Sequence, residues 1–129
     1  MDANKRECQM DQLARMVIGA AYAVSNGLGC GFLEKVYERA LAIELVRQGL
    51  KVQTQKPFPV YYLGQPVGDY LADLVVEEQV LVELKCVDSF CNEHLAQCIN
   101  YLRASDLRLA LLINFQKPRV EWKRVVLGK

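Results

Sequence analysis

The sequence predicts an α/β or α+β domain in which helices pack on a mixed β-sheet, with the element order ααβββαββ. Two segments near the N-terminus carry apolar residues at helical spacing. Two central apolar runs flank a short polar turn, and a third helical segment separates them from two further strand-like runs. With 129 residues, 52% of them hydrophobic and 24% charged, the chain is expected to form one domain spanning residues 1–129.

Two amphipathic helices are predicted at residues 10–26 and 32–48, and Gly49 is a natural end for the second. Residues 1–9 are expected to form a flexible segment before the first helix. The intervening N-G-L-G-C-G is a helix breaker. It does not resemble a phosphate-binding loop, because it lacks the G-K-[ST] ending and no strand precedes it.

Strand signals follow at residues 51–55 and 60–62, where Pro57 and Pro59 favour an edge or a bend over the sheet centre. A turn is predicted at residues 63–68. Nearly continuous apolar runs at 73–76 and 80–85 indicate central strands joined by the turn E-E-Q. The remaining elements are a helix at 92–104 and strands at 107–115 and 120–127.

The central hairpin carries charges that a core segment does not usually hold. If Val76 pairs with Val80, the same register places Asp73 opposite Glu83, and Lys85 then shares their face. Directly opposed carboxylates repel each other, so the pair favours a cation, and a divalent metal suits the oxygen ligands better than Lys85 does. The alternatives are an Asp–Lys or Glu–Lys pair at the sheet rim, or a one-residue slip that turns Glu83 to the other face.

The basic residues are concentrated near the C-terminus. Residues 103–129 have a local balance of +5 within a chain of net charge +1, so the rest carries −4. These seven are Arg103, Arg108, Lys117, Arg119, Lys123, Arg124 and Lys129. They could contact phosphates, or they could simply solvate a pair of strands.

The five cysteines include no C-x-x-C pair. Reduced thiols are favoured over a disulfide framework. Cys86, Cys91 and Cys98 could hold a metal or an iron–sulfur cluster, but their spacing matches no standard ligand pattern, and buried small hydrophobes are the favoured interpretation.

Five blocks of the sequence resemble a known family. Asp73 followed by Glu83-Leu84-Lys85 is similar to the core of the PD-(D/E)XK nuclease superfamily, and G-F-L-E-K-V-Y at 31–37 resembles the signature of its bacterial GxxExxY family. A-D-L-V-V, V-E-L-K, A-Q-C-I-N-Y-L and L-L-I-N-F are similar to later blocks, so that the resemblance spans about residues 13–126. Ala72 stands where proline precedes the aspartate in the superfamily name.

The resemblance implies a restriction-endonuclease-like sheet and a set of site residues. Asp73 and Glu83 would bind one or two Mg²⁺ (or Mn²⁺) ions, with the carbonyl of Leu84 as a further ligand. Lys85 would orient or activate water, and Glu34 would be an extra ligand or a water-bridging group.

The resemblance also places two helix residues near the site. Q-C-I-N-Y is similar to the Q-x-x-x-Y motif of RecB-like members, which implies that Gln97 and Tyr101 lie close to the carboxylates. Helical spacing independently puts these two on one face, with His94 beside them. The alternatives are that Tyr37 and Tyr101 are core aromatics, Glu34 is a helix-surface acid and His94 is a surface or packing residue.

The expected function is metal-dependent hydrolysis of nucleic-acid phosphodiester bonds, on DNA rather than RNA. The alternative is a non-hydrolytic module on the same fold that binds nucleic acid or a protein, and a homodimer or a protein partner could complete either. The N-terminal residues lack the apolar region of a signal peptide, and no apolar run approaches the roughly 20 residues that span a bilayer. A cytoplasmic protein with no membrane partner is therefore expected.

Overall fold

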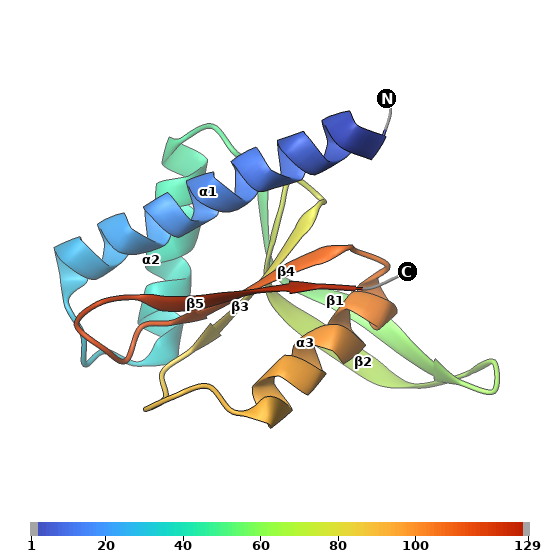
Figure 1. Cartoon of the computed structure of the whole chain (residues 1–129). Coiled ribbons are helices and arrows are strands. Elements are labelled where there is room, and N and C mark those ends of the chain that lie inside the picture. The colour runs from blue at the N-terminus through green and yellow to red at the C-terminus, as the bar shows by residue number, and fades with distance from the viewer. Residues whose placement is uncertain (1–2, 128–129) are drawn as a thin grey trace.

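The protein is a five-stranded sheet covered by helices on both faces (Figure 1). A computed structural model describes residues 3–127. The strands lie in the sheet in their order along the chain, and all neighbours are antiparallel except β3 and β4. Helices α1 and α2 cover one face and α3 covers the other, so the fold is the predicted α+β arrangement on a mixed sheet.

The observed element order is the predicted ααβββαββ. The bounds are α1 Ala3–Leu28, α2 Glu34–Arg47, β1 Val52–Tyr62, β2 Gln65–Val76, β3 Val80–Lys85, α3 Asn92–Ser105, β4 Leu109–Asn114 and β5 Glu121–Val126.

The N-terminal helix is longer than expected. Helix α1 begins at Ala3, so residues 3–9, which were expected to be flexible, continue the helix, while residues 1–2 lie outside the described part. These residues show no apolar periodicity, and this explains the misplaced start. Within residues 3–127, no helix combines the length and apolarity that a membrane crossing requires.

The first hairpin is also longer than predicted. Strand β1 runs without interruption through Pro57 and Pro59. It is the edge strand of the sheet, where proline is tolerated because N–H positions on the free side need no partner strand. The turn expected at residues 63–68 occupies only Leu63 and Gly64, and β2 starts directly after it. The outer part of this hairpin, residues 59–69, projects from the body of the protein and is called the arm below (Figure 1).

The two faces of the sheet hold separate cores. Leu74, Val82 and Leu84 pack with α1 and α2, whereas Val75 and Leu81 pack with α3, as strand alternation requires. Ala72 lies two residues from Leu74 and would share its face in a regular strand. It packs on the α3 side instead, so the alternation is broken there. The break coincides with a positive φ of 50° at Gln55 on β1, so the sheet is irregular where Asp73 stands.

Tyr37 fixes the loop that leads into α2. Its buried hydroxyl donates to the carbonyl of Gly29 at 2.6 Å and accepts from the N–H of Phe32 at 3.2 Å, and its ring stacks on Phe115 at 4.7 Å. Gly31 adopts a φ of 108°, which a residue with a side chain rarely reaches. The glycine and the tyrosine of G-x-x-E-x-x-Y therefore shape one loop and set the position at which Glu34 begins α2.

Removal of the Tyr37 hydroxyl tests this role. Tyr37→Phe keeps the ring stack but leaves the Gly29 carbonyl and the Phe32 N–H without this partner, so the free energy of unfolding should fall by about 1–2 kcal/mol. Urea denaturation followed by circular dichroism measures the loss. Tyr22→Phe on the exposed side of α1 is the matched control, and an equal loss in both variants would argue against the anchor.

Candidate active site

Asp73 and Glu83 lie where β2 and β3 separate. The ladder pairs Val76 with Val80 and Leu74 with Val82, which is the predicted register, and no further pair follows toward Asp73. Side-chain oxygens take the place of the next ladder bonds: Leu84 N–H donates to Asp73 Oδ2 at 2.9 Å, and Asp73 N–H donates to Glu83 Oε1 at 3.4 Å. Each carboxylate is thus held by the backbone of the opposite strand.

Two stacked tyrosines close the α3 side of Glu83. The Tyr70 hydroxyl donates to Glu83 Oε1, and the Tyr70 ring stacks on Tyr101 with centroids 3.6 Å apart and planes 9° from parallel. Tyr101 comes from α3, so the helix reaches the carboxylate through the tyrosine pair. The structure thus places Tyr101 against Tyr70, which contacts Glu83.

The environment of Glu83 opposes its ionisation. Glu83 is only 6% exposed. Burial first, and the neighbouring charge of Asp73 second, raise the pKa of the Glu83 carboxyl to about 8, although the hydrogen bonds from Tyr70 and the Asp73 backbone and the charge of Lys85 act in the other direction. Burial and the charge of Glu83 also raise the pKa of Tyr70, so its hydroxyl stays protonated and remains a donor.

Glu34 approaches this pair from the first turn of α2. Partial burial, then the charge of Asp73, raise the pKa of Glu34, while Lys85 and the backbone N–H of Cys86 partly oppose the shift. Lys85 is half-buried, and its charge lowers the pKa of both Glu34 and Glu83 against the larger effects that raise them.

A second acid of α2, Glu38, is connected to Asp73 through the side-chain amide of Gln55. The Gln55 amide donates to Glu38 Oε1 at 3.0 Å and lies 3.5 Å from Asp73 Oδ1. Glu38 is buried and forms an ion pair with Lys35 at 3.2 Å. The irregular backbone at Gln55 is what brings this amide between the two acids.

The remaining predicted residues of α3 are less closely tied to the acids. Gln97 is exposed, and among the described residues no hydrogen bond joins it to a carboxylate. His94 caps α3, because its Nδ1 accepts from the Cys91 N–H at 3.2 Å. The packing interpretation of His94 therefore fits the structure better than a catalytic one.

Two of the seven basic residues near the C-terminus are paired with acids. Lys117 pairs with Glu121 at 3.0 Å and Arg124 pairs with Asp11 at 2.5 Å, so two of the seven charges are offset. Arg103 is exposed on α3, and Lys129 lies outside the described residues.

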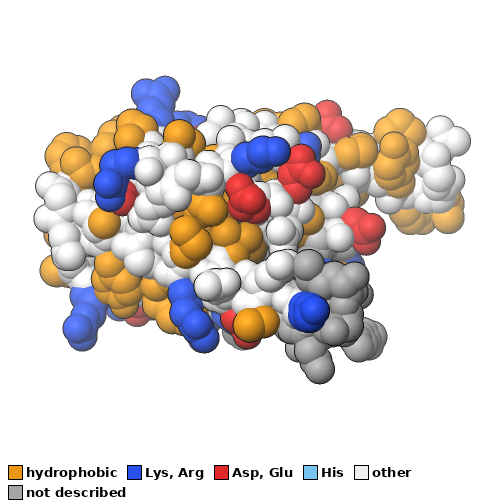
Figure 2. Space-filling view, turned by 90° about the horizontal axis from the view of Figure 1, so that it is seen from above, with side chains coloured by type: hydrophobic (Ala, Val, Ile, Leu, Met, Phe, Trp, Pro, Cys, Tyr) orange, Lys and Arg blue, Asp and Glu red, His pale blue; other side chains and the backbone are white. Residues whose placement is uncertain are grey.

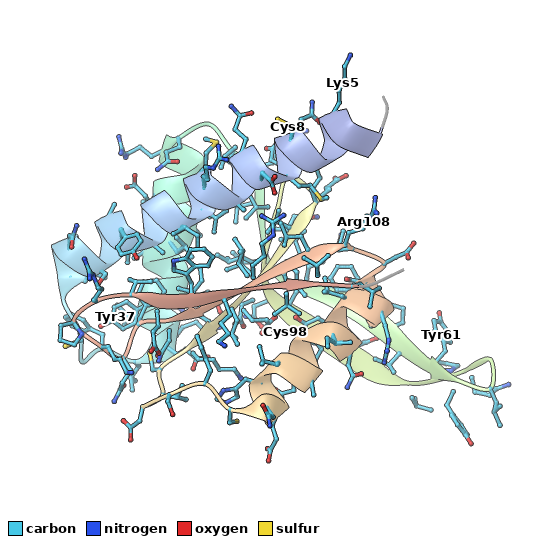
Figure 3. All side chains as sticks on the ribbon, in the orientation of Figure 1. Lys5, Cys8, Tyr37, Tyr61, Cys98 and Arg108 are labelled. Carbon is cyan, nitrogen blue, oxygen red and sulfur yellow. The ribbon has the colours of Figure 1, made fainter. Side chains whose placement is uncertain are left out.

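The cysteines are free thiols in separate surroundings. Cys98 is buried between α3 and the sheet, and burial, followed by the charge of Glu83, raises its pKa to about 11 (Figure 3). Cys91 is exposed and Cys86 is half-buried. A protonated Cys98 thiol is a poor metal ligand, so this geometry supports its role as a small hydrophobe.

The donor set suits a hard divalent cation. The hydrogen bonds above use Oε1 of Glu83 and Oδ2 of Asp73, which leaves Glu83 Oε2 and, apart from the distant Gln55 amide, Asp73 Oδ1. The carbonyl of Leu84 points to the same side of β3 as its N–H, which faces Asp73. Across residues 3–127, however, no three His, Cys, Asp or Glu side chains are gathered closely enough to hold an ion, so Glu34 does not complete a ready three-carboxylate site. Two carboxylates and one carbonyl remain as candidate ligands, with water completing the shell.

Three residues of the site escaped the sequence analysis: Tyr70, Glu38 and Gln55. Glu38 had an available signal, because it follows Glu34 by one helical turn and so lies on the same face of α2. Tyr70 and Gln55 had none, since their roles depend on where α3 packs and on the irregularity in β1.

A family model described as the PD-(D/E)XK nuclease superfamily matches residues 11–125. No curated protein sequence matches the chain significantly.

Among solved structures, the chain is similar to an alkaline exonuclease (LHK-Exo) from Laribacter hongkongensis, with a TM-score of 0.55 and 13% identity over 73% of this chain. It is also similar to SSO0001, with a TM-score of 0.57 and 17% identity over 97% of this chain. A structure of LHK-Exo in complex with dAMP has a TM-score of 0.51 and 10% identity over 84% of this chain and 76% of the other. The chain spans 56% of the first structure and 62% of the second, and identities this low show a shared fold alone.

The raised pKa of Glu83 predicts a pH-dependent stability. Between the unfolded value near 4.5 and the folded value of about 8, the folded protein binds more protons than the unfolded one, so rising pH removes stability through this window. Glu83→Gln keeps an oxygen for Tyr70 and the Asp73 N–H but cannot ionise. In metal-free buffer, the variant should therefore gain stability relative to the wild type as pH rises from 4.5 to 8.

Urea denaturation at several pH values measures this difference. Glu78→Gln in the exposed turn between β2 and β3 is the control and should show no such trend. A difference between Glu83→Gln and the wild type that stays constant across the window would contradict a raised Glu83 pKa.

Proposed function

Because this chain belongs to the PD-(D/E)XK nuclease superfamily, we propose that it is a metal-dependent nuclease that hydrolyses phosphodiester bonds with Asp73, Glu83 and Lys85. One observation carries the proposal. Two carboxylates, one of them buried, lie side by side where two strands separate, and burial first, with the charge of Asp73 second, raises the pKa of Glu83. A fold gains nothing from such a pair unless a cation offsets it.

Within the superfamily, we assign the chain to the GxxExxY family. The support is the loop of Gly31 and Tyr37, which starts α2 at Glu34 beside Asp73. In this assignment the signature positions an acid at the rim of the site, where it can bind a metal-coordinated water.

The residues of the chain have distinct roles in the proposed reaction. Asp73 Oδ1, Glu83 Oε2 and the Leu84 carbonyl would hold Mg²⁺ or Mn²⁺. The bound ion would supply a Lewis acid for the phosphoryl oxygens and a water of lowered pKa. The Tyr70 hydroxyl and the Asp73 N–H keep Glu83 in place, and Lys85 orients the attacking water or stabilises the charge that develops on the phosphate.

The proposed partner is nucleic acid, and DNA is proposed in preference to RNA. The solved neighbours support this choice: one is an alkaline exonuclease, and one of its structures contains dAMP. This chain is shorter than those proteins, so the length and form of its substrate are proposed from its own surface below.

Cleavage assays with matched variants test the function. Purified protein incubated with single-stranded and double-stranded DNA and Mg²⁺ or Mn²⁺ should cut a phosphodiester bond, and EDTA should abolish the reaction. Asp73→Asn and Lys85→Ala should each lower the rate by about a hundredfold or more, because each removes a group that acts on the reacting phosphate.

Glu78→Ala serves as the control, since this exposed acid belongs to the same hairpin but lies at its turn. Equal rates in the wild type, Asp73→Asn and Lys85→Ala would sink the assignment. Metal-independent binding of DNA without any cleavage would instead support the non-hydrolytic module.

A further inference from the structure

An open groove of about 590 Å³ lies between the arm and α3. The arm contributes three residues and α3 contributes four, among them Val60, Tyr61, Asn100, Tyr101 and Arg103. Its volume lies in the usual range for sites that bind small ligands or short segments. The lining includes Tyr70 and Tyr101 of the candidate active site but none of the proposed metal ligands Asp73, Glu83 and Leu84.

The groove leads to the candidate active site. Tyr70 and Tyr101 form one of its walls, and the Tyr70 hydroxyl contacts Glu83. A chain bound in the groove is therefore separated from the carboxylates only by the stacked tyrosine pair. Another hollow, lined by α2 with Thr54 and Gln55, also approaches the acids through Gln55, but none of the described aromatic residues lines it. Two further hollows are lined by α1 with the β2–β3 turn or by α1 with β4 and β5.

The groove lining combines aromatic rings with one positive charge. Tyr61 is 62% exposed and offers a ring face that no other described ring stacks on, while Asn100 and Arg103 add exposed polar groups. None of the described lining residues carries a carboxylate. The described lining thus presents no negative charge to a phosphate beside Arg103, although acids dominate the neighbouring site and Asp69 lies across from Pro59 on the arm.

The shape of the arm suits the same ligand. The arm projects beyond the body of the protein, and its side chains form a largely hydrophobic lobe (Figure 2). Tyr61 lies along this arm, at a distance from the rest of the sheet (Figure 3). The arm and α3 both line the groove, so a bound chain would contact the two elements together.

From this continuity and this lining, we propose that the groove binds single-stranded nucleic acid, with a base stacked on Tyr61 and a phosphate beside Arg103, and delivers the strand to Asp73 and Glu83. The inference rests on the proposed nuclease function of that site. Sequence-tolerant single-strand sites combine base stacking on aromatic side chains with cations along the backbone, which is the chemistry of this lining. A double helix keeps its bases stacked on each other and cannot offer a free base to Tyr61.

Binding measured without cleavage tests this inference. Fluorescence anisotropy of a labelled oligothymidine and of a matched duplex is recorded in EDTA, so that no bond can be cut. The wild type should prefer the single strand. Tyr61→Ala should weaken single-strand binding about fivefold or more, since base stacking on an aromatic ring is worth ~1–3 kcal/mol. Arg103→Ala should reduce the slope of log K against log salt by about 0.7, as expected for the loss of one phosphate contact on a single strand.

The chain offers a matched control for each variant. Tyr62→Ala removes the neighbouring tyrosine, which is 67% exposed on the same arm but does not line the groove. Arg119→Ala removes an exposed arginine of the loop before β5. Both controls should bind the oligonucleotide as the wild type does, and all four variants should keep the wild-type melting temperature.

The outcomes separate this inference from the proposed function. Normal single-strand binding by Tyr61→Ala and Arg103→Ala overturns the groove, whether or not the wild type cleaves DNA. A wild-type dimer that becomes a monomer in Tyr61→Ala and Tyr62→Ala, with oligonucleotide binding unchanged, also overturns the groove. That result assigns the arm to contact with a second copy of the chain. Reduced binding by the two groove variants alone supports the groove, even if cleavage assays reject the nuclease.

Discussion

The repulsion between Asp73 and Glu83 is the constraint around which the rest of the site is arranged. Where β2 leaves β3, two ladder bonds are exchanged for bonds from backbone N–H groups to carboxylates. That exchange satisfies the backbone but leaves two acids together in a partly buried place, and the raised pKa of Glu83 records the resulting cost. Tyr70 and Lys85 reduce this cost without removing it. An apolar pair would stabilise the sheet better, and a bound cation is the reason we propose for two acids at this position.

The junction between α1 and α2 positions two further acids near this pair. Tyr37 is buried and has no proposed contact with the substrate. It ties the loop before α2 to the core through Gly29 and Phe115. The consequence is that Glu34 starts a helix beside Asp73, and Glu38 lies one turn further along the same face. The signature residues thus divide into a glycine and a tyrosine that build the loop and a glutamate that reaches the site.

The sequence predicted the element order and the register of β2 with β3, because long apolar runs around a short polar turn leave few alternatives. It did not predict the break in alternation at Ala72, since this depends on the left-handed backbone of Gln55 in the neighbouring strand, a residue type without a strong preference for that conformation. Tyr70 was missed for a related reason. Its partner Tyr101 lies on α3, and only the packing of that helix on the sheet brings the two rings together. Local patterns identify the acids, whereas the groups that hold them come from tertiary contacts.

Anomalous diffraction from crystals soaked in Mn²⁺ above pH 8 is the most direct test of the central claim, because Glu83 is then ionised. A peak bound by one oxygen of Asp73, one oxygen of Glu83 and the carbonyl of Leu84 is expected. The absence of a peak there, with both carboxylates still held by their present hydrogen bonds, would show that the pair is stable without a metal and would contradict cation binding by Asp73 and Glu83.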